Sequence, residues 1–414
     1  MVCKAVVLIG GPGKATNFRP LSFRVPKPLF PVAGEPLIYH HIAACAKLPG
    51  LLEVLILGGH DESLFQEFMA SSTERLGIKI RYLKERSLMG TAGGILHYSS
   101  DIMSGMENDP TAAIFVLHGD ISCSFPLEEM LEFHSRTRPL GTILSRQVAE
   151  EESRHFGCLI HDPQTRELLH YAEKPETFVS NCVNCGVYLF STGVFPILRC
   201  AEPARDEFDN PVMSRGISPA RESPRSDGPP PLDLTLRKVS FEQDVLTPLA
   251  GTRQLYVYET EDWWTPVKLP GEALLATAQL LSRRKSELAT NGDGRPGIIG
   301  NVFIHSSTTV HETARIGPNV YIGQDCHIGA GVRIVNSILL DGVRIKDRAC
   351  VIRSIVGWDS TVGAWSRVEG CPGKITDVVV LGDDVSIGNE ICVRNCIVLP
   401  HKGINDSCSE AILL

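Results

Sequence analysis

A glycine-rich loop followed by a fixed lysine is the first feature of the sequence that could do chemistry. Gly10-Gly11-Pro12-Gly13 follows an apolar run, and Lys27 stands between two prolines. Backbone N–H groups of such a loop can bind phosphate oxygens, and the prolines hold the lysine on a stiff segment. The loop is not a Walker loop, which would need glycine at Leu8, nor a dinucleotide fingerprint, which would need glycine at Thr16. We therefore expect a local phosphate site.

Four further motifs carry side chains suited to a phosphorylated sugar. They are Gly90-Thr91-Ala92-Gly93, His118-Gly119-Asp120, Glu173-Lys174-Pro175 and Asn184-Cys185-Gly186. Carboxylate and amide groups match vicinal hydroxyls, lysine matches phosphate, and an aspartate can hold a metal ion. Each motif alone is also typical of a solvated turn, so the prediction depends on their occurring together and in order.

Alternating strands and helices are expected to bring these motifs together. Apolar, β-branched runs at 4–9, 53–58 and 113–117 predict buried strands, and 36–48 has a helical pattern. This alternation is typical of an α/β domain with a parallel sheet. Ligands of such sheets bind at the carboxyl ends of the strands, so the glycine loop and Asp120 should meet in one crevice.

A six-residue period in the last third of the chain predicts a second domain. Aliphatic residues recur at this spacing at Ile304, Val310, Ile316, Ile322, Ile328 and Ile334. The period is neither that of a helix nor that of a simple strand, and a meander of antiparallel strands would not hold it. It fits a triangular coil in which each side points one aliphatic residue at the axis. We predict an α/β domain over 1–290 and a left-handed parallel β-helix of hexapeptide repeats over 297–414.

Composition narrows the classes of function. Residues from about 213 to 231 turn to Ser, Pro, Arg and Gly, which predicts a disordered surface insertion. A formal net charge of −8 without a basic block argues against a nucleic-acid partner, and no apolar run reaches the about 18 residues that a membrane span requires.

The N-terminus carries no secretory signature, so cytoplasm is the expected compartment. The thirteen cysteines, Cys182 and Cys185 included, are expected to be reduced core residues.

The order of the motifs resembles the nucleotide-sugar pyrophosphorylases, in particular the mannose-1-phosphate guanylyltransferases. Besides the motifs above, the resemblance rests on Phe18-Arg19-Pro20-Leu21-Ser22 and Pro26-Lys27-Pro28, and with the hexapeptide tail it covers nearly the whole chain. The first loop is longer than the catalytic pattern G-G-x-G-T-R-L-x-P and is similar to that of the family's regulatory alpha subunits. The resemblance implies a Rossmann-like nucleotidyltransferase domain before the β-helix, and a role in GDP-mannose biosynthesis.

The resemblance also implies roles for single residues. The implied nucleotide-binding residues, for GDP-mannose or GTP, are Gly10, Gly11, Lys27, Gly90, Thr91, Gly93 and Asp120. The implied sugar-binding residues are Gly157, Glu173, Lys174 and Asn184. If the chain is active, Arg19 and Lys27 would serve catalysis and Asp120 would hold Mg²⁺.

Two departures from the family pattern argue against turnover. Active members hold Mg²⁺ with a second aspartate in a W-x-D-I-G motif, where this chain reads Trp264-Thr265-Pro266-Val267-Lys268. Pro266 thus replaces a carboxylate, and Mg²⁺ seldom binds tightly through one carboxylate unless substrate phosphates complete its shell. The loop arginine that would stabilise the transition state is Asn17, and losing such a cation costs roughly two orders of magnitude in rate.

Three hypotheses follow. The leading one is a GDP-mannose-binding regulatory subunit that partners a catalytic guanylyltransferase subunit, with homo- or hetero-oligomers formed through the β-helix. The second is a working nucleotidyltransferase whose metal is held by Asp120, by substrate phosphates and by a nearby carboxylate such as Asp262. The third is a hexapeptide acyltransferase that uses a β-helix histidine, namely His305, His311 or His327. Strong inhibition through a long loop of the late β-helix is not expected, because 370–374 is only a short turn.

Overall fold

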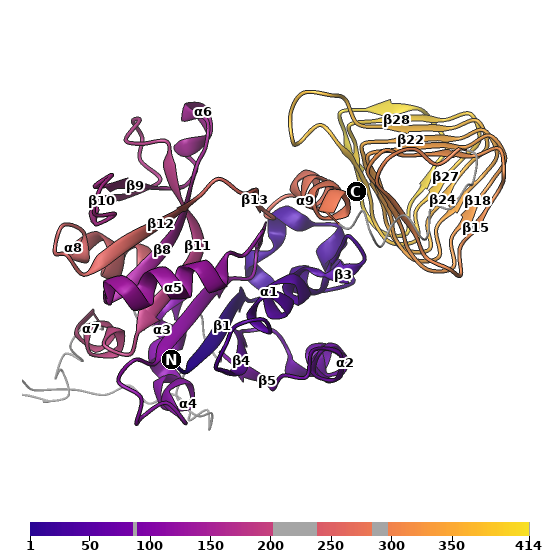
Figure 1. Cartoon of the computed structure of the whole chain (residues 1–414). Coiled ribbons are helices and arrows are strands. Elements are labelled where there is room, and N and C mark those ends of the chain that lie inside the picture. Colours follow the sequence, from indigo (N-terminus) through magenta and orange to yellow (C-terminus); the bar gives the residue numbers. More distant parts are fainter. Residues whose placement is uncertain (86–88, 202–237, 284–296, 414) are drawn as a thin grey trace, which may run out of the picture.

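The computed structural model describes residues 1–85, 89–201, 238–283 and 297–413. The predicted insertion at 213–231 lies outside these residues. Figure 1 shows an α/β body followed by a stack of flat coils, with helix α9 (Pro270–Arg283) beside the stack. Over the described part of the chain, no helix combines the length and apolarity needed to cross a bilayer.

A mixed sheet forms the centre of the first body. Its strands are β1 (Cys3–Gly10), β4 (Leu51–Gly58), β5 (Ile80–Lys84), β6 (Ala113–His118), β8 (Gly141–Gln147), β9 (Gly157–His161), β10 (Leu168–Glu173), β11 (Cys182–Ser191) and β12 (Leu255–Thr260). The main order is β10-β9-β11-β6-β1-β4-β5, with β8 joining β11 to β12. β1, β4, β5 and β6 are parallel, so their carboxyl ends share one edge.

Helices cover both faces of this sheet, which is why its central strands are continuous apolar runs. The helices are α1 (Leu37–Cys45), α2 (Gln66–Leu76), α3 (Gly90–His97), α4 (Ser99–Met103), α5 (Leu127–Thr137), α6 (Glu150–Ser153), α7 (Val194–Ala201) and α8 (Thr247–Leu249). One face packs against α3, α4 and α7, and the other against α1, α2 and α5. The three predicted strands and the predicted helix at 36–48 are confirmed, although α1 ends at Cys45.

The C-terminal body is the predicted left-handed β-helix, built from three parallel sheets. The first sheet contains β14 (Val302–Ile304), β17 (Val320–Ile322), β20 (Ser337–Leu339), β23 (Ser354–Val356), β26 (Val379–Leu381), β29 (Ile397–Val398) and β32 (Ile412–Leu413). The second contains β15 (Thr309–Val310), β18 (His327–Ile328), β21 (Arg344–Ile345), β24 (Thr361–Val362), β27 (Ser386–Ile387) and β30 (Gly403–Ile404). The third contains β16 (Arg315–Ile316), β19 (Arg333–Val335), β22 (Cys350–Ile352), β25 (Arg367–Glu369), β28 (Cys392–Arg394) and β31 (Cys408–Ser409).

The register of these sheets confirms the six-residue period. Ile304 pairs with Ile322, Val310 with Ile328, and Ile316 with Ile334, each pair joining neighbouring coils. The last four of the six predicted aliphatic residues are buried in the axial core. Ile304 and Val310, in the first coil, are only partly buried, whereas Ile316 of the same coil is buried because the segment at Ile298 bridges to it.

The two bodies share a hydrophobic junction. Helix α9 and the segment 18–37 pack on the outer face of the first β-helix sheet, in a cluster that includes Phe18, Phe30, Val267, Ile338, Ile355 and Trp358. At its edge the Arg24 guanidinium lies 3.0 Å from the Asp359 carboxylate and 2.5 Å from that of Asp383. The predicted short turn at 370–374 contributes as well, since its neighbour Ile375 packs directly on Gly271 of α9.

Candidate functional site

A cleft opens where the parallel strands β1, β4 and β6 end. It has two connected parts, cavities of about 310 and 350 Å³. The residues that line both parts are Thr91, His118, Asp120 and Lys268. The cleft therefore lies at the edge of the sheet where the strand pattern places a ligand.

The predicted nucleotide-binding loops line the first part. Gly10 and Gly11 follow β1 directly, Lys27 comes from the segment after them, and Gly90 and Thr91 begin α3. Gly10 has a φ of 65° and Gly90 a φ of 89°, a left-handed conformation in which glycine carries no steric cost. A side chain at Gly90 would also meet the Val239 carbonyl oxygen at 2.2 Å. At Gly10 and Gly90 the two loops thus present backbone atoms, and no side chains, to the cleft.

The predicted sugar-binding residues line the second part. Gly157, Glu173, Lys174 and Asn184 come from β9, β10, the turn after it, and β11. Gly157 is paired with Glu173 across two strands, and a Cβ at Gly157 would lie 2.0 Å from the Tyr171 hydroxyl. Glycine is therefore required there for Tyr171 and Glu173 to sit as they do.

Two predicted residues lie away from the cleft lining. Arg19 is exposed and its guanidinium stacks over the Phe23 ring, 5.1 Å from the centroid. Gly93 is buried inside α3, and its N–H donates to the Val239 carbonyl at 3.2 Å. Arg19 is thus not placed to act on a ligand in this cleft, and Gly93 acts by letting α3 pack closely on Val239. The ligand roles of the residues that do line the cleft stay predictions.

Asp120 is neutralised by the protein's own amines. Lys27 Nζ lies 3.3 Å from Asp120 Oδ2. Burial raises the pKa of Asp120, but the charges of Lys27, His118 and Lys268 outweigh burial and leave that pKa below its ordinary value. Asp120 is accordingly ionised at neutral pH and faces positive groups.

The residues around Asp120 do not form the two-carboxylate site that the family resemblance implies for Mg²⁺. Strand β13 (Trp264–Pro266) pairs with β7 (Ile121–Cys123) so that Pro266 stands opposite Ile121, and the Val267 N–H donates to the Asp120 carbonyl at 2.7 Å. The proline is thus held beside Asp120, where it offers no metal ligand. Among the described residues, no three His, Cys, Asp or Glu side chains gather as they would for a metal ion.

Asp262 cannot complete such a site. Its carboxylate lies 3.8 Å from the Arg283 guanidinium, is half-exposed, and does not line either part of the cleft. Asp262 is therefore not placed to be the supporting carboxylate of the second hypothesis. The side chain follows an exposed turn before β13 and points toward α9 instead.

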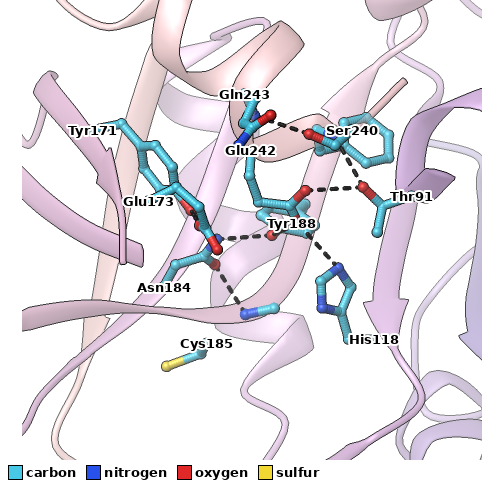
Figure 2. A network of polar contacts seen from close by, with 12 residues as sticks. Thr91, His118, Tyr171, Glu173, Asn184, Cys185, Tyr188, Ser240, Glu242 and Gln243 are labelled. Carbon is cyan, nitrogen blue, oxygen red and sulfur yellow. Dashed lines mark hydrogen bonds and ion pairs between the residues drawn. The ribbon is translucent and has the colours of Figure 1, made fainter. Parts of the chain in front are cut away.

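A polar network joins the two halves of the cleft (Figure 2). Thr91 Oγ1 donates to Glu242 Oε2 at 2.9 Å, and the Tyr188 hydroxyl donates to Glu242 Oε1 at 3.3 Å. His118 Nε2 is sheltered from solvent and lies 3.5 Å from Glu242 Oε1, a contact that is an ion pair when the imidazole is protonated. Glu242 thus contacts side chains from three elements, namely α3, β6 and β11.

The same network orients Glu173 and Asn184, the two predicted sugar-binding side chains that carry a carboxylate and an amide. Asn184 Nδ2 donates to the Tyr188 hydroxyl at 2.8 Å, and Asn184 Oδ1 accepts the Gly186 N–H at 2.9 Å. The Tyr171 hydroxyl donates to Glu173 Oε2 at 2.6 Å. Glu173 and Asn184 are therefore held in place before any ligand arrives, which lowers the entropy lost on binding.

Sequence reasoning missed part of this site. Glu242 follows the insertion and carries no motif, and Tyr171 and Tyr188 lie within strand patterns that predict only burial. His118 had a usable signal, because it directly precedes Gly119-Asp120 at the end of β6. Lys268 was visible as a replacement for glycine, but its position in the cleft was not.

The β-helix histidines do not form an acyl-transfer site with the cleft. His305 Nδ1 bonds with Ser307 and His311 Nδ1 with Thr313, each at 2.9 Å, and His327 bonds with Thr309 at 2.5 Å. His311 and His327 are exposed and His305 is half-buried, all three are engaged by hydroxyls of the β-helix, and none lines either cavity. The third hypothesis therefore gains no support.

Comparison with known proteins first defines the class. The nucleotidyl transferase family matches residues 4–211, and a family described as the GMPPB C-terminal domain matches residues 298–413. A crystal structure from Bacillus anthracis, described as a glucose-1-phosphate thymidylyltransferase, superposes with a TM-score of 0.50 at 18% identity, covering 67% of this chain and 94% of its own. At that identity it shows the fold alone. The matching family and the fold together define the first body as a nucleotidyltransferase domain.

Full-length relatives then identify the family. The mannose-1-phosphate guanylyltransferase regulatory subunit alpha of Dictyostelium discoideum is 40% identical over 99% of this chain and 98% of its own length. The Danio rerio alpha-B protein is 40% identical and the human alpha protein 41% identical, each over 99% of this chain and 100% of the relative. The chain belongs to the mannose-1-phosphate guanylyltransferase family and is of its regulatory alpha-subunit type.

Proposed function

We propose that this chain is a regulatory subunit that binds GDP-mannose in the cleft and passes the occupancy of that site to a catalytic guanylyltransferase subunit. The observation that supports it is an imbalance within one cleft. The sugar-facing network around Glu173 and Asn184 is complete, whereas Asn17 and Pro266 stand where the reaction needs a cation and a metal ligand. Interactions equal in the ground and transition states give affinity without rate.

The domain junction offers a route for that signal. Asn17 lines the cleft, and its neighbour Phe18 is buried in the core shared with the β-helix. Likewise Lys268 lines the cleft while its neighbour Val267 is buried in that same core. Ligand contacts at the cleft would therefore act on residues that hold the β-helix, the surface through which we propose that the partner binds.

We expect GDP-mannose to bind the purified chain, and the double substitution Glu173→Ala with Asn184→Ala to weaken binding at least about tenfold, because each removes a hydrogen bond to a sugar hydroxyl. Isothermal titration calorimetry measures the affinity. The matched control is Glu176→Ala with Asn181→Ala, an exposed acid and amide of the same region. Thermal melting of both double variants checks that the fold is intact.

The same experiment tests regulation. Because coupling is reciprocal, the partner should change GDP-mannose affinity by the factor by which GDP-mannose changes partner affinity, about five- to 150-fold in typical cases. If GDP-mannose binds neither the isolated chain nor the complex, or if the Glu173 and Asn184 variant regulates the partner normally, the sensor function is wrong. A purely scaffolding subunit would then be the better description.

Glu242→Gln should weaken GDP-mannose binding about three- to tenfold, roughly the value of one hydrogen bond. An amide can serve one of its two hydroxyl donors, Thr91 and Tyr188, but its nitrogen cannot accept from the other. Calorimetry reads out the change, with Glu261→Gln, an exposed acid, as control. Unchanged affinity in Glu242→Gln would show that the network does not orient the ligand.

We place this function in the cytoplasm. All thirteen cysteines are free, and burial raises the pKa of the Cys182 thiol to about 11, so it is protonated at neutral pH. This many free cysteines is typical of a protein in a reducing compartment, where thiols do not form disulfides. Cys182 and Cys185 are both buried, but Cys182 belongs to the core on one face of the sheet and Cys185 to the core on the other.

A further inference from the structure

We infer that the diphosphate of the nucleotide sugar is held by the ammonium groups of Lys27 and Lys268, with no divalent metal ion. The inference rests on the proposed binding function and adds how the site recognises its ligand. The ligand is then a nucleoside diphosphate sugar without a bound metal ion, rather than a metal-bound nucleoside triphosphate.

Lys268 occupies the space at the centre of the cleft. It lines both cavities, as Asp120 does, and its positive charge is one of the groups that hold Asp120 ionised. Its ammonium lies 5.9 Å from the centroid of the Phe156 ring, on the sugar side. The side chain therefore reaches the boundary between the two halves, where the diphosphate of a nucleotide sugar must lie.

The backbone of Lys268 is fixed on both sides. Its N–H and that of Leu269 donate to Glu272 Oε2 at 2.6 and 2.7 Å, at the start of α9, and Val267 is buried in the domain junction. Lys27 is likewise held between prolines. Two lysines on anchored backbone give a preorganised pair of point charges, which suits phosphate oxygens.

The charges immediately around Asp120 favour an anion over a cation. Lys27 and Lys268 both act on this carboxylate. The cleft is also lined by Glu85, Glu173 and Glu242, of which Glu173 accepts a hydrogen bond from Tyr171, and Glu242 accepts hydrogen bonds from Thr91 and Tyr188. His118 adds no negative charge. A divalent cation at Asp120 would meet repulsion from both lysines, whereas a diphosphate would meet attraction at the same place.

The experiment measures GDP-mannose binding to the full chain by calorimetry, once with Mg²⁺ and once with EDTA. We expect the two affinities to agree within about twofold, and Lys268→Gln to weaken binding about ten- to hundredfold in EDTA, the range for a charge-assisted hydrogen bond. Lys346→Gln, an exposed lysine of the β-helix, is the matched control and should bind as the parent does. Lys268→Arg keeps the charge and should retain most of the affinity.

The outcomes separate this inference from the proposed function. Binding that requires Mg²⁺ overturns the inference and leaves the GDP-mannose function standing. Equal affinity of Lys268→Gln and the parent, with unchanged melting, also overturns it. Absence of binding under both conditions overturns both. The converse variant, Pro266→Asp with Lys268→Gly, exchanges the ammonium for a carboxylate and should make GDP-mannose binding depend on Mg²⁺. If Lys268→Gln does not fold, this variant and Lys268→Arg test the inference in its place.

Discussion

Purified by itself, the chain should make GDP-mannose from GTP and mannose 1-phosphate at least about a hundredfold more slowly than a catalytic member of the family, because one preorganised cation is worth about that much in rate. The cleft has Asn17 where the family resemblance places the arginine that stabilises the transferring phosphoryl group. Pro266 beside Asp120 removes a metal ligand, and the space nearby belongs to Lys268. A steady-state guanylyltransferase assay with Mg²⁺ measures the rate.

Restoration is the converse of this prediction. Asn17→Arg combined with Pro266→Asp and Lys268→Gly should raise the rate, since it returns the cation and the second carboxylate and removes the competing ammonium. The same triple with Asp120→Ala is the control and should stay inactive. Robust Mg²⁺-dependent turnover by the unmodified chain, lost in Asp120→Ala alone, would mean that the chain is a working nucleotidyltransferase and that the regulatory description is wrong.

Ile322→Asp should unfold the β-helix or lower its melting temperature sharply. Ile322 is fully buried in the axial core and pairs with Ile304 and Leu339 of the coils on either side. An unpaired carboxylate there would cost several kcal/mol, about 3 or more, and neighbouring coils would lose their contact because each coil depends on the next. Circular dichroism during heating and gel filtration measure the loss of fold and of assembly.

The control for this substitution is Arg344→Asp. It introduces the same carboxylate on the same β-helix, but Arg344 is exposed and the residue after it, Ile345, is the one that points to the axis. Its melting should stay close to that of the parent. If Ile322→Asp had the same melting temperature as Arg344→Asp, the assignment of Ile322 to the axial core from the six-residue period would be wrong.

The β-helix and the parallel strands could be predicted because their causes are local and periodic. Ile316, Ile322, Ile328 and Ile334 repeat in a pattern that only one packing satisfies, so burial of every sixth residue follows directly. Strand β1 is apolar from Ala5 to Ile9 because helices cover both faces of its sheet, and the glycine loop begins at its end.

The arrangement of side chains in the cleft could not be predicted in the same way, because it depends on which way side chains point after the chain has folded. Lys268 lies in the cleft because β13 pairs with β7 next to Asp120. This pairing joins segments far apart in the sequence, so no local pattern predicts it. Glu242 reaches Thr91 across a distant part of the sequence, and Arg19 turns away to stack on Phe23 although its motif matches the family. Motifs specify residue types at positions along the chain, whereas the electrostatics of a site depend on distances in space, and those are set by packing between elements far apart in sequence.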